Sequence, residues 1–498
     1  MNVNPITRLD YPDPDVIRVE DTYYMVSTTM HFMPGCEILQ SFDLVHWEHV
    51  TYVYETLDHT DAQQLKSGQN IYGQGMWAAS LRYHEGRFCI CFVANDTRKT
   101  YLYTSEKIDG PWKKQLIEGF YHDGSLLFDE DGRNYIVYGN DEIWITELNE
   151  DLTAPKKDGL HRLLVSDHKN PELGYEGSHI QKINGYYYIF LIHSLRARWM
   201  RTEACFYSDS LEGEFTGGDV LCDDRGYCGQ GVAQGGIVDT PDGKWYAMLF
   251  QDSGAVGRIP ILLPVTWKDH FPFFGQNGHV PEEIEVHSTR PGYIYQPLVG
   301  SDDFCNGLLP RWQFNHDPDP RYYHLDALQG TYTITTREVC TELTQAVNTL
   351  TQRMSYPSCA AEVTVDASAL KEGDVAGLCA LQGCYAAVGI TKHHGKYEVL
   401  MLDKKEDGIL DMTEGTVVES HQMDFRLEAD FCNMKDEARC YYRVNKGDWL
   451  PIGTVHKLYF KLDHFTGCRF GLFCYAAEET GGSACFRDFK YYDVDEIS

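Results

Sequence analysis

The chain has 498 residues, of which 74 are acidic and 43 basic, so its formal net charge is −31 at pH 7. A surface this acidic repels phosphate backbones, which excludes nucleic acid as an expected partner. No run reaches the roughly 18 to 20 apolar residues that a membrane helix needs, so we expect a globular protein without a membrane partner.

The first part of the chain repeats one local pattern five times. Each copy has a turn with an acidic residue or glycine, followed by an aromatic-rich strand, and such turns are strong hairpin signals. The copies follow one another at steps of roughly 50 residues, the length of one four-stranded propeller blade. We expect residues 1–295 to form a five-bladed β-propeller, with a set of unrelated hairpins in a sandwich as the alternative. The turns are Glu20-Asp21, Glu85-Gly86, Asp131-Gly132, Asn184-Gly185 and Asp242-Gly243.

The repeat stops after about residue 290, and a loop-like stretch leads to residue 301. Short alternating segments then continue to the end of the chain, and about 200 residues of short strands is the size of one β-sandwich. The predicted fold class is therefore all-β, a propeller followed by a β-sandwich at residues 301–498. The clearest candidate strands are 330–336, 360–365, 377–381, 385–390 and 470–475.

The 16 cysteines contain no CxxC pair, and most stand alone inside apolar stretches. The N-terminal residues carry neither a basic start nor the apolar core of a signal peptide. Many free thiols without an export signal are typical of a reducing compartment, so we expect a cytoplasmic location.

Three carboxylates lie shortly before the first strand of three repeats. Asp13 stands between two prolines that restrict its backbone, Asp123 opens the third repeat and Glu176 opens the fourth. First strands line the channel of a propeller, so these carboxylates should converge at one mouth. Carboxylates close together raise one another's pKa, which lets one stay protonated beside an ionised neighbour, as glycoside hydrolysis requires.

Several segments resemble glycoside hydrolase family 43, in order and over nearly the whole chain. In the first part the matching segments are 11–19, 21–28, 41–47, 75–79, 123–132, 176–180, 234–245 and 257–260. The second part resembles the concanavalin-like β-sandwich that follows the propeller in β-xylosidase-like members. The matching segments there are 312–316, 350–353 and 373–378.

The resemblance implies an inverting exo-glycosidase that acts on β-xylosides or α-L-arabinofuranosides, with a xylo-oligosaccharide or arabinoxylan fragment as substrate. By motif, Asp13 matches the general base that activates water, and Glu176 matches the general acid that protonates the leaving oxygen. Asp123 matches the carboxylate that orients Glu176 and keeps it protonated by like-charge repulsion.

Four further residues are candidates for binding the substrate. Arg258 matches a residue that reaches a sugar hydroxyl, with a structural ion pair as the alternative. Trp77 matches an aromatic residue on which sugar C–H faces pack, with core packing as the alternative. Phe32 is expected to wall the pocket, with core packing as the alternative. Gln234 departs from the family, because many members carry a histidine there, near the propeller axis and sometimes bound to a cation. This departure puts a central metal in doubt, and a structural role is the stronger expectation for nearby His179.

No phosphate-binding loop, HExxH or GxSxG motif competes with this interpretation. We expect no required cofactor or metal: the acidic run at residues 317–319 could ligate calcium, but a solvated turn explains it better. The sandwich could bind sugar, brace the propeller or send a loop toward the pocket. Alternatives are a mainly α-L-arabinofuranosidase activity, a non-catalytic carbohydrate-binding propeller and a protein-interaction scaffold. The sequence leaves the oligomeric state open, and a homo-oligomer is one alternative.

Overall fold

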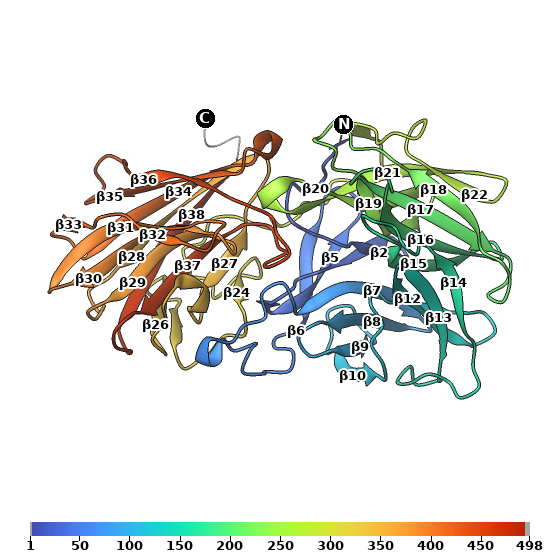
Figure 1. The fold of residues 1–498 in the computed structure, drawn as a ribbon, viewed down its shortest axis with the longest axis horizontal. Coiled ribbons are helices and arrows are strands. Elements are labelled where there is room, and N and C mark those ends of the chain that lie inside the picture. The colour runs from blue at the N-terminus through green and yellow to red at the C-terminus, as the bar shows by residue number, and fades with distance from the viewer. Residues whose placement is uncertain (1, 494–498) are drawn as a thin grey trace.

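A computed structural model describes residues 2–493, which form strands and loops with no α-helix (Figure 1). Helical backbone in this range is limited to 3₁₀ turns at Lys66–Gly68, Gly254–Val256, Leu343–Gln345 and Cys432–Met434. No helix here is long and apolar enough to span a membrane. Aromatic residues make up 13% of the chain, and such residues favour extended backbone, which accounts for the all-β fold.

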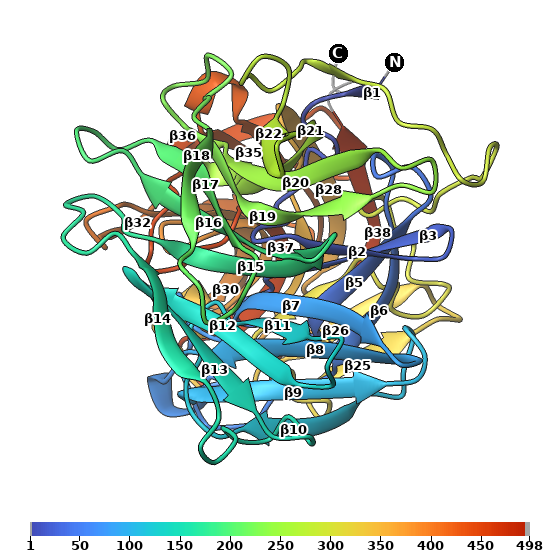
Figure 2. The ribbon, with the colours of Figure 1, turned by 90° about the vertical axis from the view of Figure 1, so that its right-hand side faces the viewer.

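The first part forms five antiparallel sheets of four strands each. They are β2 (Asp15–Val19), β3 (Thr22–Ser27), β5 (Gly35–Ser41) and β6 (Glu48–Tyr54); β7 (Met76–His84), β8 (Arg87–Ala94), β9 (Lys99–Ser105) and β10 (Lys113–Ile117); β11 (Ser125–Phe128), β12 (Asn134–Asn140), β13 (Glu142–Leu148) and β14 (His161–Ser166); β15 (Glu176–Ile183), β16 (Tyr186–Ser194), β17 (Arg201–Ser208) and β18 (Thr216–Leu221); β19 (Val232–Asp239), β20 (Trp245–Asp252), β21 (Arg258–Lys268) and β22 (Phe271–Phe274). Their first strands contact one another in a closed ring, β2–β7–β11–β15–β19–β2, and lie at the centre of the propeller in Figure 2. The prediction of a five-bladed propeller is confirmed.

In every blade the predicted turn joins the first strand to the second. At Glu85-Gly86 both residues have positive φ, 48° and 78°, and at Asn184-Gly185 the values are 51° and 85°. Two successive left-handed residues match the twist of a hairpin. The local turn chemistry therefore sets where each inner strand ends.

The second part forms two antiparallel sheets that pack as a sandwich (Figure 1). One sheet has the order β32-β31-β30-β29-β37-β27-β24-β4, with β33 beside β31, and the other has the order β25-β26-β38-β28-β34-β35-β36. The strands are β4 (Phe32–Met33), β24 (Gln313–Asn315), β25 (Tyr323–Asp326), β26 (Thr331–Thr335), β27 (Leu350–Arg353), β28 (Ser358–Asp366), β29 (Asp374–Leu381), β30 (Ala386–His393), β31 (Lys396–Lys404), β32 (Leu410–Met412), β33 (Thr416–Val418), β34 (Gln422–Asp430), β35 (Glu437–Arg443), β36 (Leu450–Lys457), β37 (Arg469–Ala476) and β38 (Ser483–Asp493). Buried aromatic side chains from both sheets, including those of Phe425 and Phe470, fill the space between them.

The predicted domain boundary, between residues 295 and 301, falls in the stretch between β23 (Glu283–Ile284), which pairs with β1 (Asn2–Val3), and β24. Residue 1 and residues 494–498, included in the predicted domain ranges, lie outside the described part of the chain.

The propeller and the sandwich share backbone and side-chain contacts. Strand β4 belongs to the first blade by sequence but pairs with β24, so it forms the edge of a sandwich sheet. The buried Arg353 side chain of the sandwich lies 2.8 Å from the Glu37 carboxylate of the propeller. Burial opposes ionisation of Glu37, but the charges of Arg353 and His49 outweigh it and lower its pKa to about 2. The two units are therefore tied by a buried ion pair.

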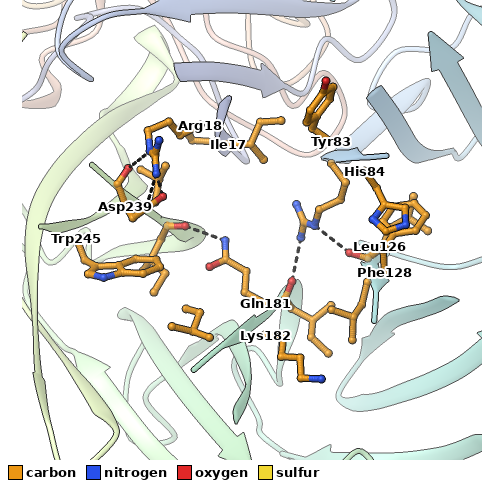
Figure 3. A pocket seen from close by; sticks show the side chains of 17 residues that line it. Ile17, Arg18, Tyr83, His84, Leu126, Phe128, Gln181, Lys182, Asp239 and Trp245 are labelled. Carbon is orange, nitrogen blue, oxygen red and sulfur yellow. Dashed lines mark hydrogen bonds and ion pairs between the residues drawn. The ribbon is translucent and has the colours of Figure 1, made fainter. Parts of the chain in front are cut away.

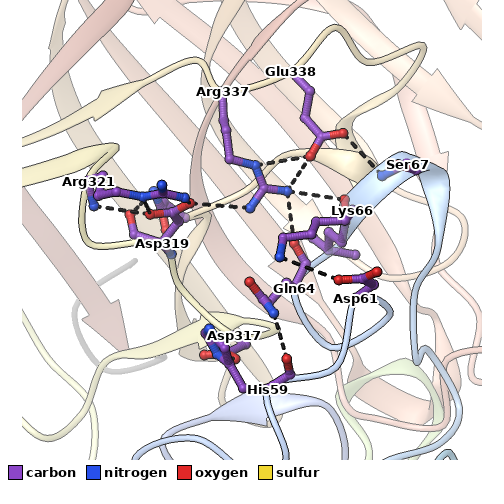
Figure 4. Close-up of polar contacts among 12 residues, drawn as sticks. His59, Asp61, Gln64, Lys66, Ser67, Asp317, Asp319, Arg321, Arg337 and Glu338 are labelled. Atoms are coloured by element: carbon purple, nitrogen blue, oxygen red, sulfur yellow. Dashed lines mark hydrogen bonds and ion pairs between the residues drawn. The ribbon is translucent and has the colours of Figure 1, made fainter.

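A second polar contact between the units involves the acidic run at residues 317–319 (Figure 4). Asp317 is 2% exposed and pairs with His59 of the propeller, while Asp319 is 7% exposed and lies 2.7 Å from Arg321. Arg337 reaches both Asp319 and the propeller backbone at Gln64. The expectation of a solvated turn is wrong here, because both carboxylates are buried against basic partners.

Candidate active site

The three predicted acids lie at the starts of inner strands. Asp13 and Asp123 each precede their strand by two residues, and Glu176 is the first residue of β15. The inner strands run in the same direction through the channel, so their starts share one end, which we call the acid mouth. The Asp13 and Asp123 side chains are 8% and 6% exposed, whereas the Glu176 side chain is 21% exposed. Glu176 is therefore the acid nearest to solvent.

Asp13 is held from two sides. The Thr28 hydroxyl donates to Oδ2 at 2.6 Å, and Nη1 of Arg258 donates to Oδ1 at 3.1 Å. The same Thr28 oxygen accepts the N–H of Ala78 at 2.8 Å, next to Trp77. Asp13 also adopts a left-handed φ of 52°, a conformation that costs energy in most residues and often occurs at functional sites. The carboxylate is thus oriented by donors on both oxygens.

A histidine that the sequence analysis did not single out lies between the other two acids. Nε2 of His122 is 3.6 Å from Oδ2 of Asp123 and 3.5 Å from Oε2 of Glu176. Asp123 also accepts the N–H of Gly177 at 3.0 Å, and Glu176 accepts Nδ2 of Asn140 at 2.6 Å. His122 is adjacent to Asp123 in sequence, but nothing in the sequence indicates that its ring faces Glu176.

The charges in this cluster shift two pKa values. Burial raises the pKa of Asp123 to about 6, with the charges of Glu176 and Asp13 adding to the effect and His122 opposing it. The charge of Asp123 raises the pKa of His122 to about 9, assisted by Glu176 and Asp13 against the effect of burial. At neutral pH His122 therefore carries a proton beside the two carboxylates.

His122, Asp123 and Glu176 each present an atom of a ligand type within 4.8 Å of the others. Asn140 donates to the Glu176 carboxylate and the N–H of Gly177 donates to that of Asp123.

The sandwich contributes an aromatic side chain to the acid mouth. Phe465 lies in the loop between β36 and β37, and its ring centroid is 5.4 Å from that of Trp77. The Trp77 ring centroid is 6.2 Å from that of His122. The Arg258 guanidinium lies 4.3 Å from the Phe465 ring centroid. The sandwich therefore sends a loop to the site, which was one of the roles considered for it.

Comparison with known families agrees with this geometry. Residues 3–272 match the family model described as glycosyl hydrolases family 43. The chain belongs to glycoside hydrolase family 43. Residues 301–492 match the concanavalin A-like domain that is C-terminal in β-xylosidases, which confirms the predicted sandwich type.

Relatives of this family 43 enzyme carry two kinds of name. A β-xylosidase of Formosa agariphila is 26% identical over 99% of this chain and 89% of its own length. A non-reducing-end α-L-arabinofuranosidase of Bacteroides ovatus is 25% identical over 66% of this chain and 63% of its own length.

Two solved structures superimpose closely on this family 43 enzyme. A bifunctional GH43-CE protein of Bacteroides eggerthii is 42% identical with a TM-score of 0.92, over 99% of this chain. This chain spans 63% of that protein's length. An engineered family 43 enzyme described as both an endo-xylanase and an exo-arabinofuranosidase is 27% identical with a TM-score of 0.86, and 99% of each chain is covered.

The two remaining predicted residues, Gln234 and Phe32, are both buried. Gln234 is 6% exposed and packs against Gly177, where an added Cβ would lie 2.8 Å from its Cδ. Phe32 is fully buried, and the Arg469 guanidinium lies 3.5 Å from its ring centroid. Unlike our expectation, Phe32 has no surface open to a sugar, because it packs in the interface with the sandwich.

Charged side chains fill the channel axis behind the acids. Nδ1 of His179 is 3.2 Å from Oδ1 of Asp15, and Nη1 of Arg82 is 2.7 Å from Oδ2. Burial opposes ionisation of Asp15, but Arg82 and His179 outweigh it and lower the pKa of this carboxyl. His179 thus has a structural partner, Asp15, which agrees with the expected structural role.

An open hollow of about 410 Å³ lies at the opposite end of the channel (Figure 3). Its walls come from the ends of the inner strands and include Arg18, Tyr83 and Lys182. Between it and the acids, Arg82 donates to the carbonyls of Leu126 and Ile180. This hollow is therefore separate from the acid mouth.

Proposed function

We propose that this enzyme is an inverting exo-glycosidase that removes terminal β-D-xylosyl residues, and also α-L-arabinofuranosyl residues, from xylo-oligosaccharides or arabinoxylan fragments. The observation that carries the proposal is the meeting of Asp13, Asp123 and Glu176 at one mouth of the channel. The names of the relatives support pentosides as the substrate class.

Each carboxylate has a distinct role in this proposal. Asp13 accepts a proton from the water that attacks the anomeric carbon, and Arg258 holds Asp13 in place. Glu176 donates a proton to the leaving oxygen from the opposite side, since it is the acid nearest to solvent. Asp123 binds the N–H of Gly177 and so fixes the backbone beside Glu176. Each proton transfer contributes about 10²- to 10⁴-fold to the rate.

Phe465 supports exo action. Its ring covers Arg258 and Trp77 from the side of the sandwich, which narrows the acid mouth and favours a chain end over the middle of a chain. We further propose that turnover needs no metal, so that dialysis against EDTA leaves kcat/KM unchanged.

We also propose a cytoplasmic location. All sixteen cysteines are unpaired in the structure, as expected in a reducing compartment. Fractionation of the source cells, followed by detection with an antibody, tests this location.

The function is tested with aryl β-xyloside and aryl α-L-arabinofuranoside, offered to the wild type and to Glu176→Gln. We expect turnover by the wild type, and NMR of the first sugar released should show the anomer opposite to that of the substrate. Turnover of neither substrate by the wild type would rule out the proposal. Retained configuration would rule out water attack assisted by Asp13.

A further inference from the structure

The ring of His122 faces two carboxylates from different blades. Its Nε2 is buried and has no hydrogen-bond partner within residues 2–493, so Oε2 of Glu176 at 3.5 Å and Oδ2 of Asp123 at 3.6 Å are the acceptors that face it. These distances are slightly long for a hydrogen bond, but in enzymes without substrate such contacts often tighten only when substrate binds.

The surroundings of His122 supply negative charge from three elements. Asp123 precedes β11, Glu176 begins β15, and Asp13 precedes β2 and is itself paired with Arg258. A ring neighbour of His122 is the uncharged side chain of Trp77. The pKa of His122 is accordingly raised to about 9, so the ring holds a proton throughout the neutral range.

We propose that His122 and Glu176 share one proton and act as a two-residue acid, in which His122 returns to Glu176 the proton that each turnover removes. The proposal rests on the proposed role of Glu176 as general acid. His122 does not touch the sugar in this scheme, so it acts through Glu176.

The proton moves in two steps. First the Nε2–H bond of His122 breaks and an O–H bond forms on the Glu176 carboxyl, which leaves a neutral imidazole and a neutral acid. The O–H bond of Glu176 then breaks as the glycosidic oxygen takes the proton, and the electron pair of the broken C–O bond stays on that oxygen. After product release, solvent returns a proton to His122, and Asp13 releases the proton that it took from water.

Substrate binding favours the first step. A bound sugar removes water from the acid mouth, and loss of water penalises an ion pair more than a neutral pair. Asp123 keeps its charge in both arrangements, so the transfer requires no change in the net charge of the cluster. The proton therefore passes to Glu176 when the sugar is in place.

The pH dependence of kcat/KM distinguishes a shared proton from a fixed positive charge. If the proton is shared, the active form persists until the pair as a whole loses it. Removing the imidazole then moves the alkaline limb to lower pH. If His122 only supplies positive charge, it promotes ionisation of Glu176, and removing it moves the alkaline limb to higher pH.

The test is the pH profile of kcat/KM on xylobiose for the wild type, His122→Gln and His161→Gln. His161 is a matched control, because its ring also lies beside a tryptophan, Trp144, but it is on an outer strand. We expect the alkaline limb of His122→Gln to fall by about one pH unit or more, with His161→Gln unchanged. An alkaline limb that stays in place or rises overturns the proposal.

A second readout separates proton supply from a structural role. A nitrophenyl pentoside has a leaving group that needs little protonation. At pH 8 the fold-loss of activity caused by His122→Gln should therefore be at least about tenfold smaller on this substrate than on xylobiose. Equal losses on both substrates would overturn the proposal. If His122→Gln does not fold, as judged by circular dichroism, His122→Asn takes its place. A wild type that cleaves neither pentoside would instead contradict the proposed function.

Discussion

The ring of Phe465, which belongs to the sandwich, lies 4.3 Å from the guanidinium of Arg258, which belongs to the propeller. The carbonyl of Phe465 also accepts Nη2 of Arg258 at 3.4 Å. The Asp10 carboxylate joins the same two segments, because it accepts the backbone N–H of Arg258 at 2.7 Å and that of Gly467 at 2.8 Å. The side chain that orients Asp13 is therefore held by both domains.

Phe465→Ala should reduce kcat/KM on xylobiose by about tenfold, because the ring's contacts with Arg258 and Trp77 contribute about 1 to 2 kcal/mol. The preference for short over long substrates should weaken as the acid mouth opens. Rates on xylobiose and xylotetraose measure both effects. Phe273→Ala, at a ring that is 49% exposed on β22, is the control. Wild-type rates and preference in Phe465→Ala would contradict a role at the site.

Arg258→Ala should abolish activity and lower the free energy of unfolding by about 3 to 5 kcal/mol, because it leaves the buried Asp13 carboxylate without its charge partner. Adding Asp13→Asn should restore part of the lost stability but none of the activity. Urea unfolding and initial rates measure the two properties. A double variant no more stable than Arg258→Ala would show that the ion pair is not the source of the loss.

The stability of the wild type should fall as the pH rises from about 6.5 to 9. The pKa of His122 is raised to about 9 in the folded state, so between pH 6.5 and 9 the folded state keeps a proton that the unfolded state has lost. The stabilisation of the folded state by this proton is therefore complete below pH 6.5 and is lost above pH 9. The slope from this group is at most about 1.4 kcal/mol per pH unit. Urea midpoints at pH 6.5, 8 and 9 should show a flatter profile for His122→Gln, while His161→Gln follows the wild type. Parallel profiles for all three proteins would contradict the shifted pKa.

Glu37 should make the interface between the domains sensitive to acid. Its pKa is lowered to about 2. The ionised carboxylate therefore stabilises the folded state fully above about pH 4.5, and this stabilisation is lost as the pH falls toward 2. Glu37→Gln should be less stable than the wild type at pH 7, and the difference should shrink by pH 3. Urea midpoints at the two pH values test this, and a constant difference would point to packing rather than charge.

Much of the fold followed from local patterns. Turns such as Asn184-Gly185 could be recognised because two successive left-handed residues are needed in a tight hairpin. Once the repeat was recognised as a propeller, the positions of Asp13, Asp123 and Glu176 before their inner strands placed them at one mouth. The loop of the sandwich was harder to predict, because Phe465 and Arg258 lie 207 residues apart in sequence and no local pattern links them.

The orientation of individual side chains also depended on the fold. His122 and Asp123 are neighbours in sequence, and in extended backbone neighbouring side chains point to opposite sides. Here both side chains interact with Glu176. The backbone is not extended at this point, because Asp123 has a left-handed φ of 48°. From the sequence we expected Phe32 to line the pocket, but the pairing of β4 with β24 buries its side chain in the interface with the sandwich.

The sequence by itself determined the strand periodicity, the hairpin turns and the kinds of acid available, because backbone preference and side-chain chemistry are local properties. Only the tertiary structure decided that His122 faces Glu176, that Phe465 covers Arg258 and that Phe32 is buried. Those relationships depend on distances through space and on the exclusion of water, which set the strength of every charge interaction at the site.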